Sequence, residues 1–129
     1  IGRFQIEAAI QSVHCARATS GITDWMALRT LYTALLSIAP TLGARVAYAA
    51  AVGRLEGPTA GLAALDTIAE DALHRFQPAW ATRAQLLFEA GSPSDALSAY
   101  DKAISLTAHG GERAYLERRR TGVAGAPGT

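Results

Sequence analysis

Two glycines that each end a helical segment, Gly57 and Gly91, lie 34 residues apart. The segments that follow them, GLAALD at 61–66 and ALSAYD at 96–101, carry apolar residues and a closing aspartate at matching positions. A period of this length with two helices per unit is typical of stacked helical hairpins. Neither hairpin buries its apolar face alone, so the repeat predicts a stack with a continuous core.

The remainder of the chain also follows helical spacing, and no run of alternating β-branched residues predicts a strand. We therefore expect an all-α fold of about seven helices stacked as antiparallel hairpins. The first five expected helices cover about residues 3–18, 24–39, 41–55, 58–73 and 78–90. A sixth begins after Ser92 or Ser94 and ends before Gly110, and a seventh covers 112–120.

Several helix ends and faces are also predicted. Thr23 is the expected N-cap of the second helix, with Asp24 in its first turn, where the helix dipole favours a carboxylate. The third helix is rich in alanine, which predicts close packing against its neighbours. The fourth is expected to turn Leu62, Leu65, Ile68 and Ala69 inward. Residues 1–121 form the predicted domain, and residues 122–129 have no core-forming pattern and are expected to be disordered.

Composition excludes some classes of function. Strong nonspecific binding to nucleic acid or to anionic membranes requires a dense basic field. The formal net charge is only +1, so we do not expect this chain to bind either of them in that way. Charged residues make up 18% of the chain, below the roughly 25% of an average globular protein, so much of its surface is expected to be buried in itself or in a partner.

The source and location are also predicted from composition. Lys102 is the single lysine beside eleven arginines, a bias that with abundant Ala and Gly indicates GC-rich coding and a bacterial source. Cys15 is the single cysteine, and no apolar run is long enough for a membrane span, so we expect a cytoplasmic protein that does not contact membranes. The chain starts without Met in an apparent helix, which suggests a part of a longer protein.

The residues that could act as metal ligands or as catalytic groups do not form a catalytic or metal-binding pattern. His14 and Cys15 are adjacent and so point about 100° apart on a helix, while His74 and His109 have no partner at ligand spacing. We expect a half-buried cysteine, solvated histidines, no metal and no cofactor. The acidic residues Asp66, Glu70 and Asp71 are interpreted as a solvated face, and the sequence predicts no enzyme. A small-molecule sensor would require a pocket near Trp25, Tyr32 and Tyr48, aromatic residues that more often belong to a core.

The run Arg118, Arg119 and Arg120 is the most basic part of the chain. These residues are a candidate electrostatic contact with phosphate or with an acidic protein. The preferred interpretation is a cationic helix end, which complements the negative end of the helix dipole.

The second repeat unit resembles the tetratricopeptide repeat, through Trp80, Ala84, Leu87, Gly91, Ala96, Tyr100 and Ala103. Arg83 and Ala108 stand where that repeat usually has leucine and proline. The resemblance implies a concave face for binding a short peptide, with Arg54, Gln85, Phe88 and Glu89 as candidate contact residues.

A second resemblance covers about residues 1–120. The stretch GRFQIEAAIQSVH at 2–14 resembles the opening of the C-terminal helical extension of certain bacterial extracytoplasmic-function (ECF) sigma factors. Seven further short motifs are similar to that family and follow in the same order. They are TDW at 23–25, LY at 31–32, LL at 35–36, G-P-x-x-G-L-x-x-L-D at 57–66, RA-x-LL at 83–87, AY at 99–100 and ER-x-x-L at 112–116. Ala47 and Tyr48 stand where family members usually carry an Asn-Arg pair.

This resemblance implies a regulatory domain that modulates promoter-dependent transcription initiation. Its implied partners are the N-terminal sigma regions of its own polypeptide and core RNA polymerase. Promoter DNA would be contacted only through those N-terminal regions, which this chain does not contain. A generic tetratricopeptide-type scaffold that binds a peptide of an unrelated partner is the alternative.

Overall fold

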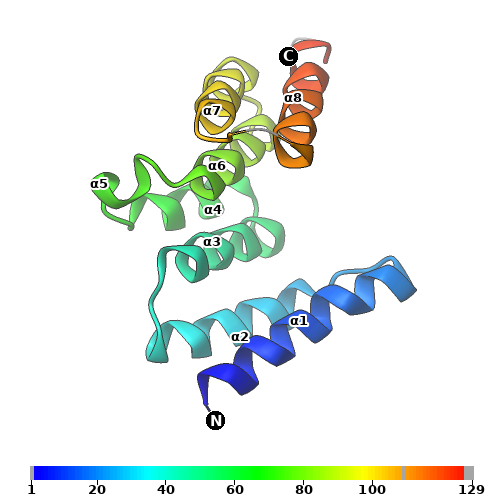
Figure 1. Ribbon diagram of the computed structural model, residues 1–129, viewed down its shortest axis with the longest axis vertical. Coiled ribbons are helices and arrows are strands. Elements are labelled where there is room, and N and C mark those ends of the chain that lie inside the picture. The colour runs from blue at the N-terminus through cyan, green and yellow to red at the C-terminus, as the bar shows by residue number, and fades with distance from the viewer. Residues whose placement is uncertain (1, 109, 127–129) are drawn as a thin grey trace.

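A computed structural model describes residues 2–108 and 110–126 of the chain. Within these residues the fold is all-α, with eight helices and no strand, which confirms the predicted class. Figure 1 shows the helices following one another from the N-terminus to the C-terminus along the long axis of the molecule. They are α1 (Arg3–Ser20), α2 (Trp25–Ile38), α3 (Leu42–Glu56), α4 (Pro58–Asp66), α5 (Glu70–Leu73), α6 (Gln77–Glu89), α7 (Pro93–Ser105) and α8 (Gly111–Ala124).

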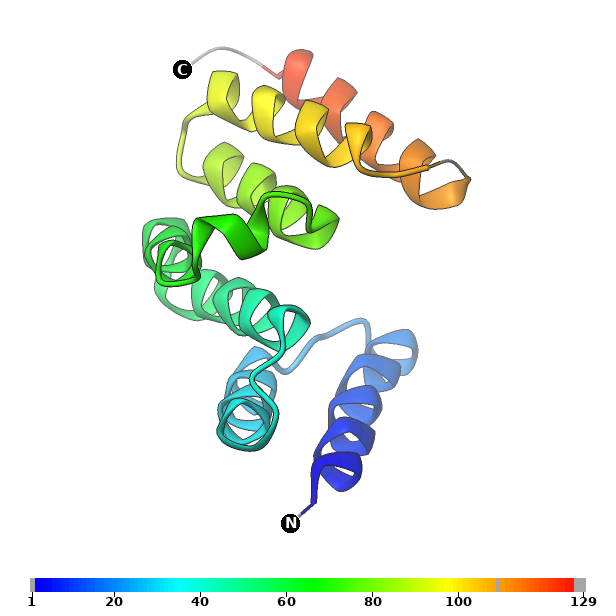
Figure 2. The ribbon, with the colours of Figure 1, turned by 60° about the vertical axis from the view of Figure 1, so that its left-hand side comes forward.

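The helices stack as hairpins whose neighbours in sequence are neighbours in space (Figure 2). The helix pairs α1–α2, α3–α4 and α6–α7 each pack together, and α8 packs on α7. Contacts of α2 with α3, and of α6 with both α3 and α4, join one hairpin to the next. Three apolar clusters follow this order, centred on α1–α2, on α3–α4–α6 and on α6–α7–α8.

The two repeat units have equivalent buried positions. Pairs of residues 35 positions apart, one in α3, α4 or the turn that follows α4 and one in α6–α7, are both buried. This is the burial expected when two hairpins use the same packing pattern. The pairs are Ala49 and Ala84, Gly61 and Ala96, Leu65 and Tyr100, and Ile68 and Ala103. Gly57 and Gly91 make the two turns with φ of 104° and 84°, values that favour glycine.

The start of α2 differs from the prediction. Asp24, rather than Thr23, is the N-cap, and its Oδ1 accepts a hydrogen bond of 3.0 Å from the backbone N–H of Ala27. The carboxylate therefore caps an unpaired N–H group in addition to complementing the helix dipole. At the start of α3, Thr41 Oγ1 accepts from the Ala44 N–H at 3.2 Å in the same way.

The prediction of a single fourth helix over residues 58–73 is wrong for its second half. These residues form two helices, α4 and α5, with a turn between them. The Thr67 hydroxyl donates to the Ala64 carbonyl at 2.7 Å, and the N–H groups of Thr67 and Ile68 bond three residues back rather than four. This tight turn competes with continuation of the helix. It places Ile68 and Leu73 in one buried cluster and leaves Ala69 exposed, so the prediction that Ala69 faces inward is also wrong.

The predicted boundary at residue 121 is wrong as well. Helix α8 continues to Ala124, because Val123 lies two turns after Leu116 on the same face and both side chains are buried against α6 and α7. Residues 127–129 of the predicted disordered tail lie outside the described residues.

Close packing of α3 was expected, and glycines provide the closest approach. A Cβ added to Gly61 would lie 2.9 Å from the Gly53 Cα and 3.1 Å from the Ala49 carbonyl oxygen. One added to Gly53 would lie 2.5 Å from the Leu86 Cδ2 atom. The backbones of α3 and α4 therefore touch, and Leu86 of α6 packs onto the two glycines.

Candidate interaction surfaces

Three of the four predicted concave-face residues lie together between α3 and α6. Arg54 of α3 and Glu89 of α6 form an ion pair of 3.8 Å, and Gln85 Nε2 donates to Glu89 Oε2 at 3.4 Å. The Arg54 guanidinium also lies 5.3 Å from the centre of the Trp25 ring. These side chains line a depression of about 70 Å³. Phe88 is 37% exposed on α6 but does not line it.

This α3–α6 depression has the chemistry of a contact surface rather than of a ligand pocket. A volume of about 70 Å³ is far below the several hundred Å³ that enclose a small molecule. The charges of Arg54 and Glu89 largely compensate each other, and Trp25 covers one side of the guanidinium. The depression therefore offers hydrogen-bonding groups, chiefly the Gln85 amide, to a polypeptide lying across α3 and α6.

The three predicted arginines of α8 are not equivalent. Arg120 donates to both carboxylate oxygens of Asp101 on α7, from Nε to Oδ1 and from Nη2 to Oδ2 at 3.3 Å. Hydrogen bonding to Asp101 raises the pKa of Arg120, and hydrogen bonding to Tyr100 raises that of Arg119. Arg118 is exposed and has no ion-pair partner among the described residues. Arg120 and Arg119 therefore both connect α8 to α7, and Arg118 is the arginine of this run that stays available for contact with a partner.

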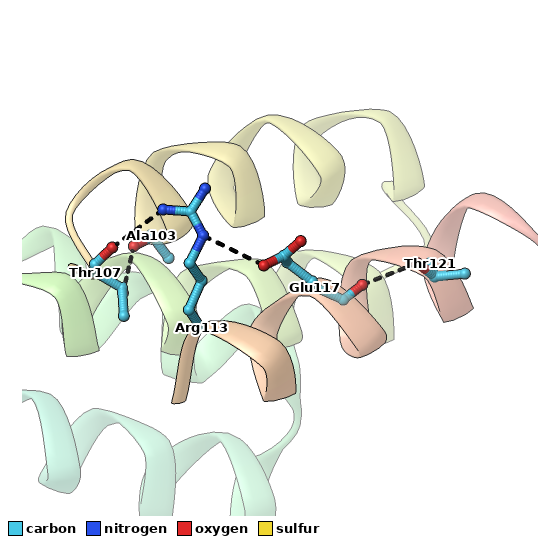
Figure 3. Close-up of polar contacts among 5 residues, drawn as sticks. All are labelled: Ala103, Thr107, Arg113, Glu117 and Thr121. Carbon is cyan, nitrogen blue, oxygen red and sulfur yellow. Dashed lines mark hydrogen bonds and ion pairs between the residues drawn. The ribbon is translucent and has the colours of Figure 1, made fainter. Parts of the chain in front are cut away.

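A further polar contact joins the start of α8 to the end of α7, beside contacts within each helix (Figure 3). Arg113 donates to the Thr107 carbonyl at 3.4 Å and pairs with Glu117 at 3.3 Å. The Thr107 hydroxyl donates to the Ala103 carbonyl at 2.9 Å, and the Thr121 hydroxyl donates to the Glu117 carbonyl at the same distance. Of these contacts, the one from Arg113 to the Thr107 carbonyl spans the Gly110–Gly111 turn.

The sequence analysis missed an apolar groove on the α1–α2 hairpin. The groove has a volume of about 690 Å³ and lies between the start of α1 and the end of α2; its lining residues are Gln5, Ile6, Ala9, Thr30, Leu31, Ala34, Ser37 and Ile38. Ile38 is 49% exposed, and Phe4, at the same end of the hairpin, is 82% exposed. Helix α1 packs chiefly against α2, which leaves part of its apolar face uncovered.

The aromatic residues considered for a sensor pocket do not converge. Trp25 lines the α3–α6 depression, whereas Tyr48 lines a separate one with Leu36 and Pro40. Tyr32 packs in the α1–α2 cluster, and burial raises its pKa. A small-molecule site at these three residues is therefore not formed.

The potential metal ligands are dispersed. Cys15 is exposed, which corrects the expectation that it is half-buried, because it lies on the solvent side of α1. His14 and His74 are exposed as predicted, and His109 lies outside the described residues. Within those residues, no three His, Cys, Asp or Glu side chains are grouped to hold a metal ion. None of the described helices combines the length and the apolar character that crossing a membrane requires.

Comparison with known proteins finds a relative that matches almost the whole of this chain. The chain is 33% identical over 128 residues to an uncharacterized protein of Rhizobium meliloti (strain 1021). The match covers 99% of this chain but 30% of the relative, so the chain corresponds to less than a third of that longer protein. No family model matches the chain. No solved structure matches it either.

Proposed function

We propose that this chain is a C-terminal regulatory module of an ECF sigma factor, acting in the bacterial cytoplasm through contacts with its own sigma regions or with core RNA polymerase. The observation that carries the proposal is the uncovered apolar groove of the α1–α2 hairpin. Six of its eight lining residues lie in residues 2–14 and 23–36, two of the stretches that carry the resemblance to ECF sigma factors.

The groove fits a helix of the sigma regions as its occupant. An amphipathic helix binds such a groove through apolar side chains spaced three and four residues apart, and Ile6, Leu31 and Ile38 offer the matching apolar wall. A segment joined to the N-terminus of α1 would emerge beside Gln5 and Ile6, which favours an intramolecular contact because the effective concentration is high. The relative, in which the matching region is 30% of the length, is consistent with a module attached to a larger protein.

The first test is the sequence that precedes Ile1 in the source gene. Helices of a sigma factor followed by a helix-turn-helix support the proposal, and an unrelated domain contradicts it. The decisive test is transcription from the cognate promoter by the full-length protein, compared with a protein truncated before Ile1. Equal transcription by the two proteins refutes the regulatory role.

A point variant tests the groove itself. Ile38→Lys places a charge in the groove at a half-exposed position near the C-terminal end of α2, where a cation is favourable for the helix. We expect it to change promoter-dependent transcription by at least about fivefold, the effect of losing one well-packed interface residue. Met26→Lys is the matched control, because Met26 is 61% exposed on the same helix and does not line the groove. An equal effect of both variants removes the groove from the proposal.

The α3–α6 depression favours a second candidate, a scaffold that binds a peptide of an unrelated partner. Arg54, Gln85 and Glu89 converge there, as the tetratricopeptide resemblance implies. The double substitution of Gln85 and Phe88 by alanine tests this candidate. If a captured partner binds the doubly substituted chain as tightly as the original, the depression is not its site.

A further inference from the structure

Two exposed aromatic side chains lie outside the α1–α2 hairpin. Six large apolar side chains of the described residues are exposed, and four of them belong to that hairpin or to the turn within it. The other two are Phe88 near the end of α6, which is 37% exposed, and Tyr115 of α8, which is 51% exposed. Single exposed apolar residues are common on protein surfaces, so the neighbours of these two rings decide what the rings can do.

Tyr115 has two arginines as neighbours on its own helix. Arg118 and Arg119 follow it by three and four residues, which places the three side chains on one side of α8. A hydrogen bond to Tyr100 raises the pKa of Arg119 and holds its guanidinium, while Arg118 is exposed and has no ion-pair partner among the described residues. This side of α8 therefore presents an aromatic ring beside one positioned and one available cation, and tyrosine and arginine are the residue types on which binding energy concentrates.

This side of α8 continues onto the end of α6. The two helices share a buried cluster, and the nearby charge of Glu89 adds to the effect of Tyr100 in raising the pKa of Arg119. Glu89 also pairs with Arg54 of α3 at 3.8 Å, and Phe88 precedes it on α6. The predicted concave-face residues and the predicted arginine run therefore meet at Glu89. We call the result the α6–α8 surface, formed by Phe88, Glu89, Tyr115, Arg118 and Arg119.

The α6–α8 surface is positive, but it is not a dense basic field. Arg54 compensates Glu89, which leaves the two positive charges of Arg118 and Arg119. Glu112, one turn before Tyr115 on α8, reduces this excess to one positive charge. Two carboxylates among the arginines disfavour the phosphate backbone of a nucleic acid, which requires many cations in a row. A short polypeptide segment with a few carboxylates matches the charge of this surface.

We propose that the α6–α8 surface binds an acidic segment of a partner polypeptide. A carboxylate of the segment pairs with Arg118, and the charge of Arg119 favours a second one beside it. An apolar side chain between the two carboxylates covers the rings of Tyr115 and Phe88. This proposal rests on the second candidate function, the peptide-binding scaffold, and extends it from the α3–α6 depression to α8. It is independent of the α1–α2 groove.

Isothermal titration of the 129-residue chain with the synthetic peptide EDLWDE tests the proposal. At about 50 mM salt, where exposed charges are weakly screened, we expect a Kd between about 10 µM and 500 µM. The charge-reversed peptide KRLWRK is expected to bind at least about tenfold more weakly, because the arginines repel it. The peptide EDGSDE, which keeps the charges but lacks the apolar residues, is also expected to bind at least about fivefold more weakly.

Variants of α8 locate the binding site. Arg118→Glu is expected to weaken EDLWDE binding at least about tenfold, and Tyr115→Ala at least about fivefold. Both side chains are exposed, so the helical fold should persist, and circular dichroism verifies it. The matched control is Arg75→Glu, which makes the same change of charge at an exposed position between α5 and α6. It is expected to bind EDLWDE as the original chain does.

The proposal is overturned by absence of EDLWDE binding up to about 5 mM, by equal binding of KRLWRK, or by equal losses in the Arg118 and Arg75 variants. Tighter binding of an oligothymidylate than of EDLWDE also overturns it, because the surface would then serve a nucleic acid. A loss in Gln85→Ala without a loss in Tyr115→Ala would place the peptide in the α3–α6 depression. That outcome would overturn the contact with α8 and leave the scaffold function standing.

Discussion

The hairpins α3–α4 and α6–α7 use the same packing pattern but differ in the residues at the helix crossing. In α3–α4 the crossing is formed by Gly53 and Gly61, whose backbones touch. In α6–α7 the position equivalent to Gly61 is Ala96, which is fully buried. The equivalent position therefore carries a buried methyl group in the second hairpin and no side chain in the first.

This difference reflects what each hairpin supports. The α3–α4 crossing receives Leu86 of α6, so its glycines leave room for a side chain of the next hairpin as well as for each other. The α6–α7 hairpin instead builds a cluster with α8, in which Tyr100, Leu116 and Val123 are buried. The α3–α4 hairpin therefore joins the stack through two glycines that accommodate Leu86 of the next hairpin. The α6–α7 hairpin is instead completed by the large side chain of Tyr100 and by the covering helix α8.

The largest expected effect is that of Gly61→Ala. Because its Cβ would meet the backbone of Gly53 and Ala49, which cannot move aside, we expect the free energy of unfolding to fall by about 2–4 kcal/mol in urea denaturation. The reciprocal change in the second hairpin, Ala96→Gly, is expected to cost about 1–2 kcal/mol, because it leaves a small void and loosens the helix.

Gly43→Ala is the control for this comparison. Gly43 is also in α3, but nothing lies within 4 Å of its added Cβ. The substitution should increase stability by up to about 1 kcal/mol, since alanine favours the helix. If Gly61→Ala is also neutral or stabilising, the glycine contact does not define the first hairpin.

The next effect concerns the covering helix of the second hairpin. Val123→Ala removes two buried methyl groups from the cluster of α6, α7 and α8, so we expect a loss of about 1–2 kcal/mol in urea denaturation. Arg118→Ala, an exposed change in the same helix, should alter stability by less than about 0.5 kcal/mol. Equal, negligible effects of both changes would mean that α8 ends before Val123 in solution.

The smallest effect distinguishes two ion pairs at equivalent places. Asp66 comes directly after the buried Leu65 of α4, as Asp101 comes directly after the buried Tyr100 of α7. Asp66 pairs with Arg83 of α6, and Asp101 pairs with Arg120 of α8. Double-mutant cycles with Asp→Asn and Arg→Gln should give the stronger coupling for Asp101–Arg120, because Arg120 contacts both carboxylate oxygens. Both couplings should weaken in about 1 M salt, since the groups are exposed to solvent. A stronger coupling for Asp66–Arg83 would contradict this reading.

Helical periodicity, together with the glycines and prolines that mark helix ends, was sufficient to predict most of the helices and the order of the hairpins. The turns at Gly57 and Gly91 and the buried pair Leu65 and Tyr100 follow from the repeat, because local spacing determines which face is apolar. The break at Thr67 could not be predicted in this way, because it depends on where Ile68 and Leu73 meet α6. The same is true of Val123, whose burial depends on the α6–α7 surface.

The candidate surfaces were less predictable than the fold. The convergence of Arg54, Gln85 and Glu89 follows from the tetratricopeptide resemblance. The α1–α2 groove does not follow from any residue pattern, because an apolar stripe reveals which residues avoid water but not which element covers them. A cavity lined by Glu70 and Leu73 forms only where α4 ends and α5 begins, so it could not be predicted without the break between these helices.

The order of the helices in the stack has a consequence for how the chain folds. Its principal interhelix contacts join only helices of the same hairpin or of adjacent hairpins. Such a topology has a low contact order, so we expect folding within about microseconds to milliseconds. It also lets a terminal hairpin open while the central ones remain folded, as expected for a nearly one-dimensional array. The α1–α2 end can therefore exchange amide hydrogens faster than α3 and α6 without global unfolding.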